Sequence, residues 1–164
     1  MSGRDYQLAV LPVLERHFDD VRLEWSIPRG ATDRFAPNAT VYAPRVDIAV
    51  GPFSLEPGRS AAIDAELLPP RLRGLFEGRP ANANPRCLLA IEVYFSGSSK
   101  HIMGDMLNAG ALGLYGLIVG ADEHMAKIRR IGRYVEILGD LGKMPWLFRN
   151  VVALSATEFD ALIR

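Results

Sequence analysis

Two carboxylates stand out in this sequence because each lies inside a short apolar run. Asp47 lies in the run at 46–50, and Glu92 lies near the end of the run at 88–93. Buried carboxylates are costly to ionise and are seldom left without a partner. If the two runs are neighbouring strands, Asp47 and Glu92 can share a site for a hard cation. The alternative is that each carboxylate ends its strand and points into water.

A phosphate-binding element is expected a few residues after Glu92. Ser98 and Ser99 precede a helix that opens with Lys100, and either serine can cap that helix. Amide N–H groups at the start of a helix point toward an anion that lies ahead of it. Lys100 in that place can hold a phosphate oxygen or orient an attacking water.

The same helix is expected to present a polar face to a substrate. Helical spacing places polar side chains in one arc, with small residues between them: Lys100, His101, Asp105 and Asn108. His101 can act as a base, contact a phosphate or have no role, and Asn108 can contact the substrate. The arc is either the approach path of a substrate chain or an ordinary solvated face.

The chemistry that these residues favour is metal-assisted phosphodiester cleavage. A divalent cation lowers the pKa of a water and neutralises the charge that grows on the phosphate. Mg²⁺, or Mn²⁺ in its place, takes oxygen ligands and keeps several waters, so Asp47, Glu92 and the Val93 carbonyl would suffice. Glu15 lies beside the apolar stripe of the first helix. It is either a further metal ligand or lysine-orienting group, or a side chain that reaches water from the edge of that stripe.

Hydrophobic periodicity predicts the elements that position these residues. The strands are expected at 21–27, 40–50, 88–95 and 115–119 and within 146–155, and the helices at 5–18, 100–112, 122–138 and 157–163. Thr157 is a suitable cap for the last helix. This order predicts an α/β fold, with a mixed β-sheet flanked by helices in a single domain.

The stretch 51–86 is the hardest to assign because prolines and glycines are concentrated there. Short helices fit at 61–68 and 71–76. We interpret the stretch as a long loop or insertion over the surface that connects two core strands. It could instead lie over the site as a lid or belong to a partner interface.

The composition indicates one neutral domain without a membrane span. The chain has 164 residues, 49% of them hydrophobic, and its 19 basic and 19 acidic residues cancel. This net charge argues neither for nor against nucleic-acid binding, because a small basic patch on one part of the surface would not be visible in it. No signal segment opens the chain and no apolar run has the length of a membrane span, so a soluble, cytoplasmic protein is expected. The single cysteine, Cys87, excludes an internal disulfide and a cysteine zinc cluster.

The two carboxylate segments resemble a known family. Asp47 ends the sequence PRVD, and Glu92 is the centre of IEV. These segments and the order of elements around them resemble the PD-(D/E)XK nuclease superfamily, which has the restriction-endonuclease-like fold; the likeness covers about residues 5–155. In that family the two acidic residues bind Mg²⁺ and a lysine two positions after the second assists the water. The resemblance therefore implies that Asp47 and Glu92 are metal ligands.

The chain departs from the family pattern at the lysine. The position two after Glu92 is Tyr94, which cannot supply a cation. Some members carry the lysine on the following helix, and Lys100 in the sequence SGSSKH resembles that variant. An acidic residue on the first helix is common in the family and matches Glu15. The long gap between the two carboxylates implies that 51–86 is an insertion.

The resemblance implies a metal-dependent nuclease acting on nucleic acid, DNA rather than RNA. Asp47 and Glu92 would hold Mg²⁺ and Lys100 would contact the phosphate or the water, while Glu15 would support them. By analogy with small nucleases that cut two strands, a homodimer is expected. The alternative is a catalytically inactive member of the fold that binds nucleic acid or protein. A third hypothesis, a plain interaction domain, requires Asp47 and Glu92 to lie far apart.

Overall fold

The computed structural model describes residues 1–27, 43–54, 62–143 and 148–164. Its centre is a five-stranded sheet with the spatial order β1-β2-β3-β4-β5. The strands are β1 (Val21–Ser26), β2 (Arg45–Phe53), β3 (Cys87–Tyr94), β4 (Gly113–Gly120) and β5 (Val151–Ser155). The helices are α1 (Gly3–Leu14), α2 (Pro70–Gly74), α3 (Ser99–Leu112), α4 (Met125–Asp140) and α5 (Ala156–Ile163). Single 3₁₀ turns, η3 (Ala65–Leu67) and η4 (Asp122–His124), precede α2 and α4.

The sheet is mixed, as the order of elements predicted. Strands β1, β2 and β3 pair antiparallel, whereas β3, β4 and β5 pair parallel. Helix α3 connects β3 to β4, and α4 connects β4 to β5. Each of these crossovers moves one strand along the sheet in the same direction, so crossovers of the usual right-handed kind place both helices on one face. The predicted α/β class is confirmed.

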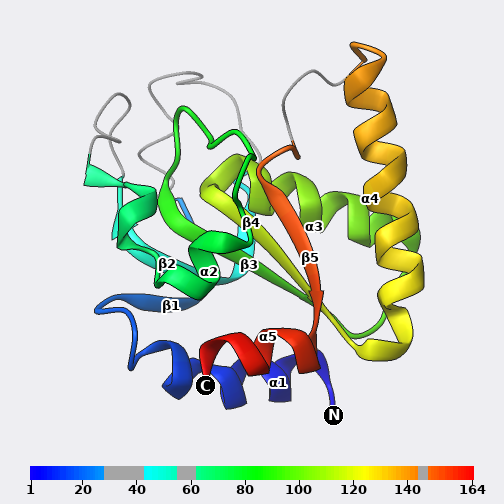
Figure 1. Ribbon diagram of the computed structural model, residues 1–164. Helices are drawn as coiled ribbons and strands as arrows, with labels where there is room; N and C mark the ends of the chain where they lie inside the picture. The colour runs from blue at the N-terminus through cyan, green and yellow to red at the C-terminus, as the bar shows by residue number, and fades with distance from the viewer. Residues whose placement is uncertain (28–42, 55–61, 144–147) are drawn as a thin grey trace.

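Each face of the sheet has its own core. Helices α1, α2 and α5 cover one face, where Leu14, Leu72 and Phe159 are buried among the strand side chains. Helices α3 and α4 cover the other face, where Ile102 and Ile128 are buried. In Figure 1, α1 and α5 lie together beneath the sheet, and the C-terminal half of α4 rises beyond the strands. Residues that alternate along β2 and β3 therefore face different helices.

Several side chains between β2 and β3 pack into the core, so the stretch 51–86 is only partly a surface excursion: most residues of 62–86 are exposed or half-buried. Leu68, Leu72 and Phe76 are buried against the α1/α5 face, and the Phe76 ring stacks on Tyr115 with the centroids 4.3 Å apart. Prolines and glycines interrupt the apolar pattern of this stretch, so the burial of these side chains became clear only from the tertiary packing. The same placement argues against a lid, since Asp47 and Glu92 face α3. Residues 55–61 lie outside the described part.

The residue that caps α5 lies two positions before the expected one. Ser155, and not Thr157, caps the helix: its side chain accepts a hydrogen bond from the Glu158 amide, and the Glu158 carboxylate accepts one from the Ser155 amide. This reciprocal pair is a capping box, which satisfies two amides at once and so outcompetes a lone threonine. The Thr157 hydroxyl donates to Asp122 instead.

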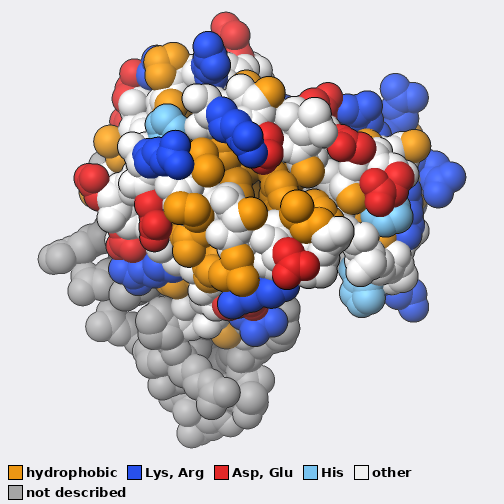
Figure 2. All heavy atoms as spheres, turned by 90° about the horizontal axis from the view of Figure 1, so that it is seen from below, with side chains coloured by type: hydrophobic (Ala, Val, Ile, Leu, Met, Phe, Trp, Pro, Cys, Tyr) orange, Lys and Arg blue, Asp and Glu red, His pale blue; other side chains and the backbone are white. Residues whose placement is uncertain are grey.

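The exposed side of α1 and α5 is partly apolar. Figure 2, the view from below, shows hydrophobic side chains gathered over these two helices, with charged side chains around them. Leu8 of α1 is 51% exposed, whereas Tyr6, Val10 and Leu14 are buried against the sheet. No helix in the described part of the chain is long and apolar enough to span a bilayer.

Candidate functional site

Asp47 and Glu92 are cross-strand neighbours. Ile48 pairs with Ile91 in the antiparallel β2–β3 ladder, so the next opposed positions are Asp47 and Glu92. The Asp47 amide donates to Glu92 Oε2 at 3.2 Å, and the Val93 amide donates to Asp47 Oδ2 at 2.7 Å. The two carboxylates thus accept hydrogen bonds from the backbone at the end of the β2–β3 ladder. The structure brings together the two residues that the sequence analysis paired.

Helix α3 contributes two more polar groups to the same place. Asn108 Nδ2 lies 3.3 Å from Glu92 Oε1 and 3.2 Å from the Arg45 carbonyl oxygen, to both of which it donates. Asp105, about one turn earlier, faces the same hollow, which has a volume of about 310 Å³. The hollow is lined by Arg45, Asp47, Glu92, Val93, Tyr94, Ser96, His101, Asp105 and Asn108. We call it the carboxylate hollow.

The carboxylate hollow holds more carboxyl groups than can readily be ionised at the same time. Burial, then the charges of Asp47 and Asp105, raises the pKa of Glu92 to about 9. Burial and the Asp47 charge raise the pKa of Asp105 to about 7, and burial also raises the pKa of Asp47. With no cation bound, Glu92 therefore keeps a proton at neutral pH.

The positive charge nearest to this cluster is shared. Arg45 lines the hollow and its charge lowers the pKa of Asp47, but its Nε also lies 3.2 Å from Glu24 Oε2. Glu24, from β1, in turn raises the pKa of Asp47. The arrangement leaves an excess of oxygen donors and negative charge that a bound cation would relieve.

The donor set fits a hard cation that retains water. Among the described residues, no three histidine, cysteine, aspartate or glutamate side chains converge closely enough to hold a metal ion by themselves. Mg²⁺ needs no such cage, because one or two carboxylates and several waters complete its coordination. Asp47 and Glu92 can supply those carboxylates, and protonated Glu92 would release its proton on binding.

The start of α3 holds His101 at the edge of the hollow. Ser98 caps the helix, and its amide donates to His101 Nδ1 at 3.2 Å. The neutral imidazole must then carry its proton on Nε2, which makes Nε2 a donor. Ser98 and Ser99 themselves do not line the hollow; Ser96 does. The two serines of the expected phosphate-binding element therefore lie outside the hollow.

Lys100 is not brought to the carboxylates. It is exposed, does not line the hollow and, within the described part of the chain, makes no hydrogen bond or ion pair. The reason is helical phase: His101, Asp105 and Asn108 share a face at i, i+4 and i+7, and Lys100 is rotated from His101 by about 100°. The polar arc expected from the sequence was too wide, because it included Lys100. It did include Asp105, which faces the hollow, but gave that residue no chemical role.

Tyr94, two positions after Glu92, is occupied by other contacts. Its ring is buried and its hydroxyl donates to the Gly97 carbonyl. Lys127 of α4 donates to that hydroxyl at 2.9 Å and to the Gly97 carbonyl at 2.8 Å. A lysine from a different helix thus fixes the loop that forms one wall of the hollow.

Glu15 is not part of the hollow either. It is exposed and caps the C-terminal end of α1. The opposite end of that helix lies by the site, since a Cβ added at Gly3 would lie 3.6 Å from the Val93 carbonyl oxygen. A helix of 12 residues is roughly 18 Å long, which separates Glu15 from Glu92. Of the two roles considered, reaching water from the edge of the stripe fits the structure.

Gly97→Ala is expected to destabilise the fold by about 1–3 kcal/mol and to displace His101. Gly97 has φ +132°, which L side chains rarely adopt, and an added Cβ would lie 2.7 Å from His101 Nδ1. Gly104→Ala is the control, because a Cβ there meets nothing within 4 Å and alanine favours the helix. Urea unfolding measures both; equal stability of the two variants would contradict the role of Gly97.

Comparison with known proteins adds no relative. No family model, curated protein or solved structure matches the chain. We therefore base the functional proposal on the geometry of the carboxylate hollow and on the resemblance of its two carboxylate segments.

Proposed function

We propose that this protein is a divalent-cation-dependent phosphodiester hydrolase that acts on nucleic acid, with DNA as the preferred substrate. One observation carries the proposal: carboxylates from two adjacent strands and one helix meet in a polar hollow in which their charges repel. Groups whose pKa is strongly perturbed by burial and by a specific neighbour are concentrated at functional sites. The preference for DNA comes from the resemblance to the PD-(D/E)XK nucleases.

The residues of the hollow have distinct roles in this proposal. Asp47 and Glu92 hold Mg²⁺ or Mn²⁺, and Asp105 either joins them or binds a metal-bound water. The cation, when bound, supplies Lewis-acid polarisation of the phosphate and a lower pKa for the attacking water. His101 Nε2–H donates to a phosphate oxygen, and Arg45 supplies positive charge beside Asp47. Lys100, at the exposed start of α3, contacts a phosphate farther along the chain of the substrate.

The inactive binding module remains the second candidate, and a specific observation favours it. Tyr94 stands where the resembling family has its lysine, and the structure gives Lys100 no place beside the carboxylates. A site without that lysine could hold a cation and nucleic acid without cutting. In either case a homodimer would present one carboxylate hollow to each strand of a DNA duplex.

Cleavage of end-labelled DNA tests the two candidates. The active enzyme is expected to cut DNA in Mg²⁺ or Mn²⁺, to stop in EDTA, and to cut RNA of the same sequence more slowly. Retention of DNA in a mobility-shift assay without cleavage in any divalent cation would support the inactive module. A protein that neither cuts DNA nor retains it in any divalent cation would overturn the proposal.

A further inference from the structure

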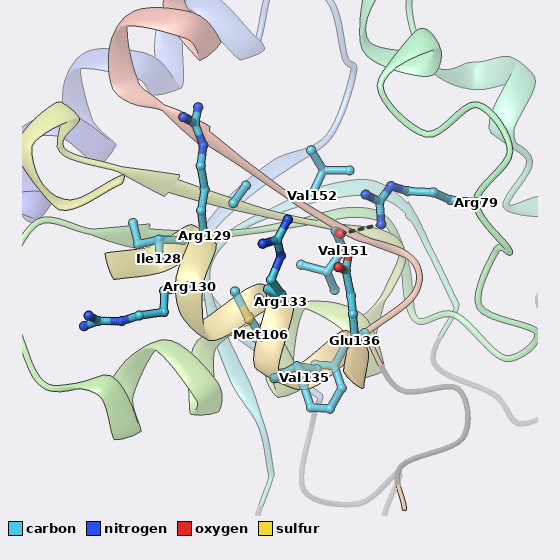
Figure 3. Close-up of a pocket in the computed structure, with 13 residues that line it drawn as sticks. Arg79, Met106, Ile128, Arg129, Arg130, Arg133, Val135, Glu136, Val151 and Val152 are labelled. Atoms are coloured by element: carbon cyan, nitrogen blue, oxygen red, sulfur yellow. Dashed lines mark hydrogen bonds between the residues drawn. The ribbon is translucent and has the colours of Figure 1, made fainter. Parts of the chain in front are cut away.

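A second hollow lies between α4 and the outer edge of β5, away from the carboxylates. Its volume is about 500 Å³, and Figure 3 shows side chains from α4, from β5 and from the segment before β3 around it. It shares no lining residue with the carboxylate hollow. Strand β5 ends the sheet, so only β4 pairs with it among the described strands. We call this second hollow the arginine groove.

The floor of the arginine groove is apolar. Side chains from α3, α4 and the strand β5 region form it: Met106, Ile128, Val135, Phe148 and Val151. Each of these is buried in the core of the α3/α4 face. These side chains expose little surface of their own. A ligand body that rests here would gain free energy mainly by covering the half-buried Val152 and Ala153 and the aliphatic stems of the arginines.

The rim of the groove is basic. In Figure 3, Arg129 and Arg133 rise from α4 in the same direction, whereas Arg130 points away. Arg79 closes the opposite side and donates at 3.2 Å to the carbonyl oxygens of Arg149 and Val151. These arginines concentrate positive charge in a chain whose net charge is zero.

The charge on the rim is only partly neutralised. Arg129 Nη2 lies 3.2 Å from Glu158 Oε1, and Arg133 has no ion pair within the described part of the chain. Glu136 is the one acidic residue among the described residues that line the groove. Like charges at i and i+4 on a helix repel, so an anion between Arg129 and Arg133 would relieve that repulsion.

We propose that the arginine groove binds an organic phosphate of nucleotide size. The phosphates lie between Arg129 and Arg133, whose planar guanidinium groups can each donate two bonds to phosphate oxygens. The organic body covers the apolar surface that is still exposed in the groove, which a bare anion would leave in water. The volume of about 500 Å³ falls in the usual range for small-molecule sites. The ligand is either a free nucleotide or the phosphorylated end of a nucleic-acid strand, which present the same chemistry.

Calorimetric titration of the full chain with adenosine 5′-diphosphate tests the proposal. Binding is expected, and Arg129→Gln or Arg133→Gln should weaken it about ten-fold each, since a charged hydrogen bond is worth about one such factor. Arg16→Gln is the matched control, because it removes one exposed arginine at the end of α1 and should leave the affinity unchanged. Pyrophosphate should bind at least about ten-fold more weakly, since it cannot use the floor.

Other outcomes decide against the groove. The absence of binding heat, equal affinity for pyrophosphate, or undiminished binding by the Arg129→Gln/Arg133→Gln double variant would each overturn the proposal. A 5′-phosphorylated oligonucleotide that displaces the diphosphate supports a strand end as the source, and failure to displace it supports a free nucleotide. Glu92→Gln should not alter this binding, so failure here and failure of the proposed hydrolase are separate results.

Discussion

Glu92→Gln is expected to stabilise the metal-free protein by roughly 4 kcal/mol at pH 8 and to destabilise it slightly at pH 5. Holding the buried Glu92 proton at pH 8, with a pKa raised to about 9, costs roughly 5 kcal/mol relative to the unfolded chain. Glutamine has no proton to hold. The single side-chain oxygen of glutamine can accept a hydrogen bond from the Asp47 backbone amide or from the Asn108 side chain, but not from both. The hydrogen bond that is lost costs about 1 kcal/mol.

The pH dependence has a definite sign. Because the folded-state pKa of Glu92 lies above its ordinary value of 4.5, the folded state binds more protons than the unfolded state between about pH 4.5 and pH 9. The free energy of unfolding of the wild type should therefore fall as the pH rises through this window. In Glu92→Gln the slope should be much smaller.

Urea unfolding at several pH values measures both effects. Glu77→Gln serves as control, because Glu77 is exposed and its replacement should change stability by less than about 0.5 kcal/mol. A Glu92→Gln variant that is less stable than wild type at pH 8 would show that Glu92 is ionised and well compensated in the folded state. The hollow would then hold no unfavourable charge for a bound cation to relieve.

Asp47→Asn is expected to reduce DNA cleavage by at least about a thousand-fold in saturating Mg²⁺. The change removes one of two charged metal ligands, and metal activation of water and phosphate accounts for several kcal/mol of the barrier, at about 1.4 kcal/mol for each factor of ten. It also lowers the repulsion on Glu92, so stability should not fall. The rate of cleavage and the rise in Tm on adding Mg²⁺ should both be lost together.

Lys100→Ala provides the matched comparison. Because Lys100 is exposed and does not line the hollow, its loss should leave the Mg²⁺-induced rise in Tm unchanged and slow cleavage by only a few-fold. The salt dependence of DNA binding should become shallower by about one phosphate contact. A complete loss of cleavage in Lys100→Ala would show instead that this lysine moves to the carboxylates when substrate binds. Wild-type cleavage by Asp47→Asn would contradict the proposed metal site.

The sequence by itself determined the elements and the central pair of carboxylates. The alternation of apolar residues in strands and their helical spacing are local properties, so the strands carrying Asp47 and Glu92 and the helix after them could be read directly. One carboxylate in each of two apolar runs was enough to suggest that they meet. The structure shows that they do, because each carboxylate accepts a hydrogen bond from a backbone amide of the other residue's strand.

Only the tertiary structure decided which other residues reach that pair. A rotation of about 100° between successive helical residues separates Lys100 from His101, and the packing of α3 on β3 selects Asp105 and not its neighbours. The direction of α1 places Gly3 by the site and Glu15 at the far end. The arginine groove likewise exists only because α4 packs beside the edge strand β5. Local patterns specify how side chains alternate along one element, whereas the rotation and direction of one element against another depend on packing between distant parts of the chain.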